Sequence, residues 1–484
     1  MEIEPTVNQI SMDELSVLEL KVPAVDNKPM TYLEALSSFL KFSDEEALLL
    51  INLPGHLGNR LARESVREWV QLLQNRSSLP TTEASRLGPD ILWQLGYKIP
   101  KSFKTSGSTT IRTFLAIDPH DRLSVVKYSD QEGFEENGIP WLRKEAARME
   151  EYRFYLGHHV PAVFDRVEVA AQDDRDSAFF YSMEYRPFET LSEYLLYDPA
   201  ATGQEFFRRL DVALNQQVEM LYDQPDTWIS PNQQGENSYV QTFYLDKFKQ
   251  RLALLTDPIN HTAAMFASLI HADTLTINGI PYTNLPRLLE LLDIHKDRIN
   301  QIEPKLLGLA HGDGHLGNMG FEIGKPIENG LVLFDLRGVD LSTRMDIAYD
   351  IGKLAFSFLH ALVDRTHALT VPVPSLEVNE ETKEVSARLE FDASQIDKII
   401  LHIALRNQLE GFLQNHQPLV AVLRKMGEES ETWLARAKLT EAMQLLGIAP
   451  DRLEDDPSGG TAMTYYVLST LVLNGFLRSV VGVL

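Results

Sequence analysis

The stretch HGDGHLGNM, residues 311–319, gathers two histidines, an aspartate and an asparagine between glycines. The run LLGLA at 306–310 precedes it, and a second apolar segment starts at Met319. A core segment would avoid so many polar groups, and an ordinary surface turn needs fewer of them. The pattern therefore indicates a functional loop, which could be a metal site, the surroundings of a nucleophile or a phosphate-transfer loop.

The residues after this loop predict two strands joined by a turn, since MGFEI, GKPIENG and LVLFD follow one another. If the strands pair antiparallel, Asn318 at the entry of the first lies near Asp335 at the exit of the second, because cross-strand neighbours are about 5 Å apart. Asp313 lies on the preceding loop. Two carboxylates and an amide oxygen that converge in this way suit a hard divalent cation such as magnesium, which substrate phosphates often complete.

The loop has two other interpretations. Glycine, asparagine and aspartate are ordinary turn formers, so a lone Asp and Asn at this spacing would favour a plain turn. The complete HGDGHLGN before a hairpin ending in LFD favours function instead. A zinc site built on His311 and His315 has no obvious third ligand in the sequence.

The motif HGDGHLGN, followed by LFDLRG and DIAYDIGKLA, resembles the aminoglycoside phosphotransferase and choline-kinase branch of the protein-kinase-like fold. The resemblance implies that Asp313 is the catalytic base and that Asn318 and Asp335 bind magnesium. It also implies that Asp350 braces the loop. Protein kinases have arginine where Gly312 stands, which favours the small-molecule branch.

A kinase-like lobe needs a strand lysine that holds the nucleotide phosphates and a helix carboxylate that holds the lysine. Lys127 follows the apolar run at 123–126. In the helix predicted over 140–156, Glu145 falls on an apolar stripe, where a carboxylate is costly unless it is paired. We therefore expect Lys127 to pair with Glu145, with Glu150 as the second candidate.

Two further nucleotide contacts are predicted. Gly107 and Ser108, in KTSGSTTIRTF, would cover the phosphates, although relatives have more glycines there and a polar turn explains the stretch nearly as well. In FFYSMEYRPF, the backbone groups of Glu184 and Tyr185 would contact adenine in the linker between the lobes.

The organisation along the chain predicts an α+β, bilobal protein-kinase-like fold. We expect a helical N-terminal extension over 1–95 and an N-lobe over 96–187 with a small antiparallel sheet and one key helix. A mainly helical C-lobe over 188–484 would carry the catalytic loop and inserted hairpins. The resemblance covers about residues 100–360. Arg337 departs from the family pattern, and either a phosphate contact or a surface position would explain it.

Composition limits the classes of partner. The chain has 45 basic and 69 acidic residues, a net charge of −24, which argues against nucleic acid and anionic membranes as partners. It has no cysteine, which excludes disulfides, thiolate nucleophiles and cysteine-bound zinc. The start lacks the features of a signal peptide, and the apolar end at 461–484 reads as a buried helix rather than a membrane anchor. We therefore expect a cytoplasmic protein.

The resemblance implies ATP- and magnesium-dependent phosphorylation of a hydroxyl on a small molecule. One alternative is an ATP-dependent carboxylate–amine ligase, because the combined motifs are faintly similar to siderophore synthetases. A protein kinase and a catalytically inactive kinase-like binding module are the others. The sequence does not specify the acceptor, the oligomeric state or the role of residues 1–95.

Overall fold

The computed structural model describes residues 19–20, 30–31, 92, 95–103, 111–120, 122–130, 138–169, 177–186, 188–198, 201–231, 238–256, 269–336, 344–372, 377–379, 384–456 and 458–482. The helical extension predicted for 1–95 therefore lies almost wholly outside the described residues. Two short strands, β1 (Glu19–Leu20) and β2 (Met30–Thr31), pair antiparallel there.

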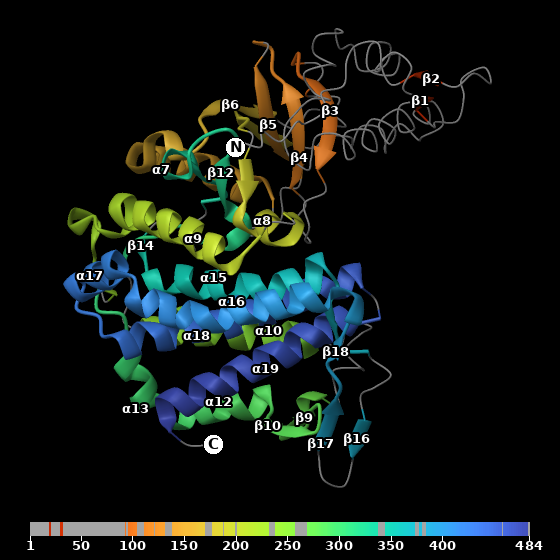
Figure 1. Ribbon diagram of the computed structural model, residues 1–484, viewed down its shortest axis with the longest axis vertical. Helices are drawn as coiled ribbons and strands as arrows, with labels where there is room; N and C mark the ends of the chain where they lie inside the picture. Colours follow the sequence, from red (N-terminus) through yellow and green to blue (C-terminus); the bar gives the residue numbers. More distant parts are fainter. Residues whose placement is uncertain are drawn as a thin grey trace. The chain divides into compact units, whose positions relative to one another are not determined.

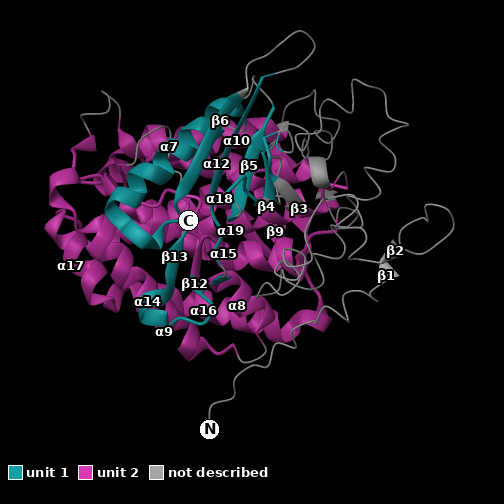
Figure 2. Ribbon diagram, turned by 90° about the horizontal axis from the view of Figure 1, so that it is seen from above, with its two compact units in different colours: residues 1–189, 321–333 teal, residues 190–320, 334–484 magenta. Residues whose placement is uncertain are grey.

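The chain divides into two compact units (Figure 2). The first comprises residues 1–189 and 321–333, and the second comprises 190–320 and 334–484. A small antiparallel sheet characterises the first unit, whereas the second is mainly helical. The predicted α+β class is confirmed.

The first unit is built on a five-stranded antiparallel sheet with one long helix packed against it (Figure 1). Its elements are β3 (Lys98–Phe103), β4 (Arg112–Ile117), β5 (Leu123–Ser129), α7 (Ile139–Leu156), β6 (Val163–Val169) and β7 (Ala178–Glu184). The strand order is β3-β4-β5-β7-β6. Strands β4 and β5 pair antiparallel, and so do β6 and β7, as the predicted small antiparallel sheet requires.

Alternation along β5 separates the two faces of this sheet. Val126 and Tyr128 belong to an apolar cluster with Phe114 and Phe180 on the neighbouring strands. Because successive side chains of a strand point to opposite faces, Lys127 points away from that cluster. Its neighbour across β7 is Tyr181.

The predicted strand–turn–strand after the candidate loop is also present. Strands β12 (Met319–Glu322) and β13 (Leu331–Leu333) are neighbours in a three-stranded sheet with β8 (Phe188–Thr190). The turn between them contains the short helix α14 (Ile327–Gly330). His159, which follows α7, contacts the start of β13: one of its ring nitrogens forms a hydrogen bond with the Leu331 carbonyl at 2.9 Å.

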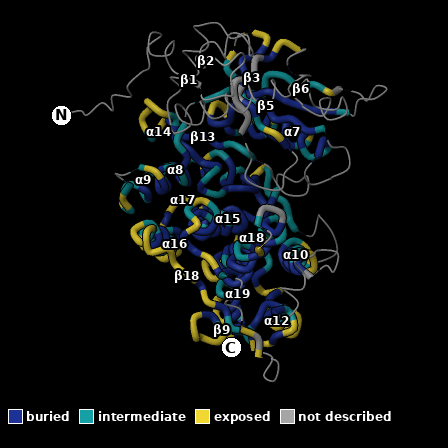
Figure 3. Tube along the Cα trace, turned by 90° about the vertical axis from the view of Figure 1, so that its right-hand side faces the viewer, coloured by how far each residue is buried: buried dark blue, intermediate teal, exposed yellow. Residues whose placement is uncertain are grey.

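The second unit consists mainly of helices. They are α8 (Leu191–Tyr197), α9 (Gly203–Gln217), α10 (Asp246–Thr256), α12 (Leu285–Ile294), α13 (Lys296–Ile299), α15 (Ile347–His360), α16 (Ile396–Asn415), α17 (Gln417–Lys425), α18 (Ser430–Asp455) and α19 (Gly460–Val481). Helices α15, α18 and α19 are largely buried, whereas α16 exposes one side to solvent (Figure 3).

A glycine permits the close packing of α15 on α18. A Cβ atom at Gly352 would lie 2.3 Å from Thr440 Cβ and 2.4 Å from the Ala437 carbonyl oxygen. Any larger residue would push the two helices apart, so Gly352 fixes their separation.

The two inserted hairpins join in a single small sheet. Strands β9 (Thr274–Ile277) and β10 (Ile280–Thr283) are connected through Asn278 and Gly279, which have φ of 50° and 82° as an Asn-Gly hairpin turn requires. Strands β16 (Glu377–Asn379) and β17 (Glu384–Ala387) form the second hairpin. The joining parallel pair, β9 with β17, was not predicted from the sequence.

Two further antiparallel pairs are short: β11 (Gly308–Leu309) with β14 (Arg344–Met345), and β15 (Leu369–Thr370) with β18 (Glu390–Phe391). The apolar C-terminal segment forms α19, most of whose residues are buried. Its polar Asn474 exchanges two hydrogen bonds with the Thr283 backbone, at 3.2 and 2.9 Å. Among the helices that the structure describes, none is long and apolar enough to cross a membrane.

Candidate active site

The loop that starts at His311 is held by the buried carboxylate of Asp350, on the first turn of α15. One carboxylate oxygen accepts the His311 N–H at 2.7 Å, and the other accepts the Gly312 N–H at 2.9 Å. The Tyr222 hydroxyl donates a third hydrogen bond at 3.1 Å. Gly312 has a φ of 78°, which favours glycine there. Burial raises the pKa of Asp350, against the effect of His311 and of these hydrogen bonds. The contacts are those expected of a brace.

The carboxylate of Asp313, the predicted base, is 4% exposed and lies on this braced loop. The ammonium of Lys353 lies 2.8 Å from its Oδ1, and His315 Nε2 lies 4.0 Å from its Oδ2. Lys353 was not identified from the sequence. The available signal was its position on α15, three residues after Asp350, because residues at that spacing share a helix face.

One face of α15 thus supports the whole loop. Asp350 and Lys353 contact its start, and the Ser357 hydroxyl accepts the Leu316 N–H at 2.9 Å. These three residues follow the spacing of a single helix face. The loop conformation therefore depends on how α15 is placed.

Asn318 ends the short 3₁₀ turn Leu316–Asn318, just before β12. Its side-chain amide nitrogen donates to the Asp313 carbonyl at 3.0 Å. This hydrogen bond fixes which way the amide faces, and it leaves the side-chain oxygen without a hydrogen-bond partner among the described residues. Asn318 therefore presents an oxygen that can bind a cation.

Asp335 follows β13 by two residues, is half-buried and has a φ of 52°. Just before it, the Phe334 N–H donates to the Asn318 carbonyl at 3.3 Å, which brings the two segments side by side. The sequence-predicted residues Asp313, Asn318 and Asp335 therefore belong to one region of the second unit.

The buried ring of His311 lies among these carboxylates. Burial lowers its pKa, although Asp350, Asp313 and Asp335 act in the opposite direction. Its Nδ1 accepts the Asp313 N–H at 3.3 Å, and its Nε2 has no partner within the described part of the chain. At neutral pH His311 is therefore uncharged.

The donor set suits magnesium better than zinc. No group of three or more His, Asp or Glu side chains in the described ranges is arranged to hold a metal ion. Magnesium fits two protein oxygens, here the Asp335 carboxylate and the Asn318 amide, because it retains waters and binds substrate phosphates. A structural or catalytic zinc site needs three or four protein ligands.

In the first unit, Lys127 and Glu145 form the expected ion pair at 2.5 Å. The two residues are 8% and 3% exposed. The Tyr181 hydroxyl, which the sequence analysis missed, donates to the same carboxylate oxygen at 2.8 Å. Glu145 therefore holds Lys127 in a fixed position on β5, while the role of this pair in nucleotide binding stays a prediction.

Three other residues of this unit were predicted to contact Lys127 or the nucleotide: Glu150, Glu184 and Tyr185. Glu150 is exposed and pairs with Arg166 instead. The N–H groups of Glu184 and Tyr185 donate within the sheet, to the Ala162 carbonyl at 2.8 Å and the Leu123 carbonyl at 3.4 Å. A contact of these residues with adenine would therefore not use those two N–H groups.

The Glu184 carboxylate binds Arg186 at 2.6 Å and accepts the Ala162 N–H at 3.1 Å. Burial raises its pKa, but these hydrogen bonds outweigh burial and lower the pKa overall. Gly107, Ser108 and Arg337 lie outside the described residues.

No family model and no curated protein matches the chain. Among solved structures, the chain is similar to a Ralstonia eutropha JMP134 protein described as an aminoglycoside phosphotransferase, with 13% identity, a TM-score of 0.38 and coverage of 79% of this chain and 92% of that chain. It is also similar to a Thermobifida fusca YX-ER1 protein described as a fructosamine-3-kinase, with 13% identity, a TM-score of 0.38 and coverage of 81% and 99%. Both names denote small-molecule kinases, the class that the motif at 311–318 resembles. At TM-scores of this size, neither likeness carries an argument on activity.

Proposed function

We propose that the protein is an ATP- and magnesium-dependent phosphotransferase that phosphorylates a hydroxyl group of a small molecule. The observation that carries the proposal is the braced loop of the second unit. It presents a carboxylate from Asp313 and an amide oxygen from Asn318 that has no hydrogen-bond partner among the described residues, while Asp350 fixes its backbone. An ordinary surface turn does not need a buried carboxylate such as Asp350 to accept two of its backbone N–H groups.

The proposed chemistry follows from this arrangement. The Asp313 carboxylate positions the acceptor hydroxyl and accepts its proton as the acceptor oxygen bonds to the γ-phosphorus. The bond from that phosphorus to the bridging oxygen breaks, and ADP leaves with the electron pair. In such transfers most of the rate enhancement comes from positioning and charge stabilisation.

Other residues have supporting roles in the proposal. Asn318 and Asp335 would hold magnesium, which supplies charge neutralisation of the nucleotide phosphates when bound. Lys127 would bind phosphate oxygens, and the ion pair with Glu145 keeps its side chain in one orientation. Burying a lysine and a carboxylate together costs desolvation free energy. A role in phosphate binding would explain why the protein keeps this buried ion pair.

The test combines nucleotide analysis with one conservative variant. The full chain would be incubated with ATP, magnesium and a panel of sugars, amino sugars, amino alcohols and one mixed protein substrate, and the released nucleotide identified. We expect ADP with a small-molecule hydroxyl acceptor. Asp313→Asn should lower turnover by about a thousandfold or more and should still bind ATP.

Other outcomes would contradict the proposal. Release of AMP and pyrophosphate would identify a carboxylate–amine ligase, and transfer to the protein substrate alone would identify a protein kinase. ATP binding without turnover across the panel would identify a binding module. Full activity of Asp313→Asn would remove Asp313 from the mechanism.

A further inference from the structure

A cavity lies within the helical unit, between α15, α16, α18 and α19. It has a volume of about 520 Å³, which is within the usual range of small-molecule pockets. Its walls are mainly aliphatic, with leucine, isoleucine, valine and alanine side chains from all four helices and from the segments around β15 and β18.

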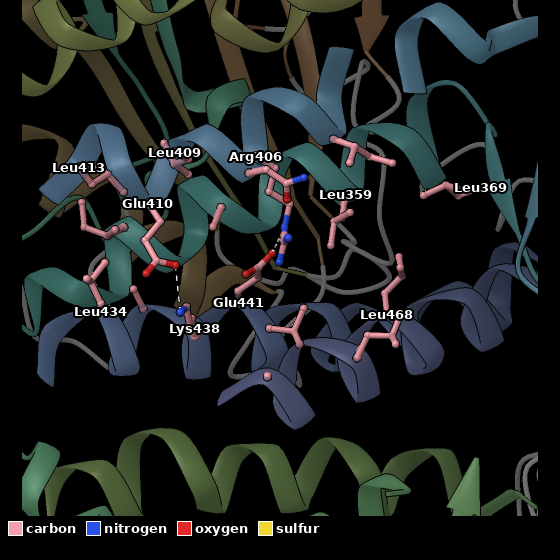
Figure 4. A pocket seen from close by; sticks show the side chains of 18 of the residues that line it. Leu359, Leu369, Arg406, Leu409, Glu410, Leu413, Leu434, Lys438, Glu441 and Leu468 are labelled. Atoms are coloured by element: carbon pink, nitrogen blue, oxygen red, sulfur yellow. Dashed lines mark hydrogen bonds and ion pairs between the residues drawn. The ribbon is translucent and has the colours of Figure 1, made fainter. Parts of the chain in front are cut away.

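Two ion pairs cross the middle of this cavity. Arg406 on α16 donates to Glu441 on α18 at 2.6 Å, and Lys438 pairs with Glu410 at 2.9 Å. Figure 4 shows Arg406 and Glu441 pointing toward each other, with leucine side chains on both sides of the pair. The cavity is thus apolar at its ends and polar at its centre.

Arg406 has unused hydrogen-bonding capacity. Only its Nε donates to Glu441, and its two terminal nitrogens have no hydrogen-bond partner among the residues that the structure describes. The side chain is 27% exposed, and Arg406 lines the cavity. An arginine carries five N–H donors, and a ligand oxygen could accept from the remaining ones.

The charges of this central group are balanced. Arg406 and Lys438 provide two cations, and Glu410 and Glu441 provide two anions. A charged ligand would leave one charge uncompensated at a partly desolvated position, which is unfavourable. An uncharged oxygen can instead accept from Arg406 without disturbing either ion pair.

We propose that this cavity is a binding site for an elongated, mainly aliphatic molecule that carries one uncharged hydrogen-bond acceptor, a hydroxyl or carbonyl oxygen. The aliphatic chain lies against the leucine-rich walls, and its oxygen accepts a hydrogen bond from Arg406.

The cavity is separate from the loop around Asp313. Ile351, Ala355 and Leu359 line it from α15 and follow one helix face, at i, i+4 and i+8. Asp350 and Lys353, which contact the loop, lie on the opposite face of the same helix. The proposal of a binding site in this cavity is therefore independent of the phosphotransferase proposal.

Gly475 offers a direct test of the site. It lines the cavity from within α19, and a Cβ atom there would meet no atom of the described residues within 4 Å. Gly475 is exposed at the cavity wall, so Gly475→Leu would narrow the cavity. It should not harm the fold, because leucine is a better helix former than glycine. Gly411 is the matched control: it also lies inside a helix, α16, has open space around its Cβ position and does not line the cavity.

The probes are octanol, decanol and dodecanol, with decanoic acid and decylamine as charged controls, added to the full chain below their aggregation concentrations. Binding would be measured by calorimetry and by the shift in Tm. We expect decanol to raise the Tm of the wild-type protein and of Gly411→Leu. Gly475→Leu should fold with at least the wild-type Tm and show at least a tenfold higher Kd for decanol. The charged probes should bind about tenfold or more weakly than decanol.

A paired variant tests the role of Arg406. Replacing Arg406 and Glu441 together with methionine avoids a lone buried charge, which often preserves stability. The paired variant should discriminate less between decanol and a plain alkane of the same length. The proposal is overturned if the wild-type protein binds none of the alcohols, if Gly475→Leu binds decanol as the wild type does, or if decanoic acid binds more tightly than decanol.

Discussion

The ammonium of Lys353 lies 2.8 Å from Oδ1 of Asp313, and both side chains are largely buried. The pair joins the predicted base to α15, the same helix that braces the loop through Asp350. A cation at this position stabilises the ionised form of the carboxylate and limits its rotation. In a phosphoryl transfer it would also stand close to the charge that develops on the transferred group.

Replacing Lys353 with methionine should therefore reduce turnover more than nucleotide binding. Methionine keeps much of the side-chain length and removes the charge. We expect kcat for ADP release to fall by about tenfold to a thousandfold, with the KM for ATP changed much less. The measurement is steady-state kinetics on the acceptor found in the nucleotide assay.

Lys353→Arg is the matched control, since it keeps a cation at the same position and should recover part of the lost kcat. A purely structural lysine would give a different result. Both variants would then lose stability to chemical denaturation, while kcat per folded molecule would stay at the wild-type value.

Gly352→Ala should destabilise the protein and also impair the site. The added Cβ would lie 2.3 Å from Thr440 Cβ, so α15 must move away from α18. Overpacking of this kind typically costs about 1–3 kcal/mol of unfolding free energy. Because Asp350 and Lys353 belong to α15, we expect kcat to fall together with stability. Urea unfolding and ADP release would be measured on the same preparations.

Gly447→Ala provides the control for Gly352→Ala. Gly447 lies inside α18, and a Cβ atom there would have no neighbour within 4 Å in the part of the chain that the structure describes. The same chemical change should be neutral or stabilising by about 1 kcal/mol, because alanine is the better helix former. If the two variants changed the free energy of unfolding equally, the close contact of α15 with α18 at Gly352 would not determine stability.

The long-range features that the sequence predicted have a common physical basis. Glu145 falls on the apolar face of its helix, so it needs a buried cation, and Lys127 on the neighbouring strand was the available one. The apolar run at 123–126 predicted a strand that ends near Lys127, and β5 spans Leu123–Ser129. A buried charge without a partner costs free energy, and this cost restricts which side chains can lie next to Glu145.

The features that were missed depend on contacts between distant segments. Tyr181 reaches Glu145 only because β7 lies next to β5, and strand order is not encoded locally. The parallel pair of β9 with β17 joins two hairpins that are far apart in the chain. Lys353 was the exception, because its spacing from Asp350 placed it on the face of α15 that contacts the loop.

The free energy of unfolding should decrease as the pH is lowered, and protonation of His311 in the unfolded chain should cause part of this decrease. Burial lowers its pKa, so the folded protein keeps the ring neutral at a pH where the unfolded chain, with a pKa of about 6.5, binds a proton. The stability is therefore complete above about pH 6.5 and declines as the pH drops toward the folded-state pKa, by at most about 1.4 kcal/mol per pH unit for one such group.

His311→Asn retains an acceptor for the Asp313 N–H and removes the titrating ring. Between pH 7 and pH 5, its unfolding free energy should decline less steeply than that of the wild type, as measured by urea unfolding at each pH. His271→Asn, at an exposed position, serves as the control and should keep the wild-type slope. An unchanged slope in His311→Asn would show that His311 does not contribute to acid sensitivity.

Arg436 should be among the most important side chains for stability in the second unit. It is fully buried in α18, and it binds Asp346 at 2.5 Å and Glu428 at 2.9 Å. Asp346 in turn caps α15 by accepting the Ala348 N–H at 3.0 Å. Arg436→Met leaves two buried carboxylates without their cation, and we expect the unfolding free energy to fall by about 3–5 kcal/mol.

Arg208→Met is the comparison for Arg436→Met, because Arg208 forms an exposed ion pair with Glu205 on α9. Pairs of that kind contribute about 1 kcal/mol or less, so urea unfolding should barely distinguish this variant from the wild type. Because Asp346 begins the helix that carries Asp350 and Lys353, Arg436→Met should also reduce ADP release per folded molecule. If Arg436→Met were as stable as Arg208→Met, the buried network would not be what anchors α15, and the loop at His311 would need another support.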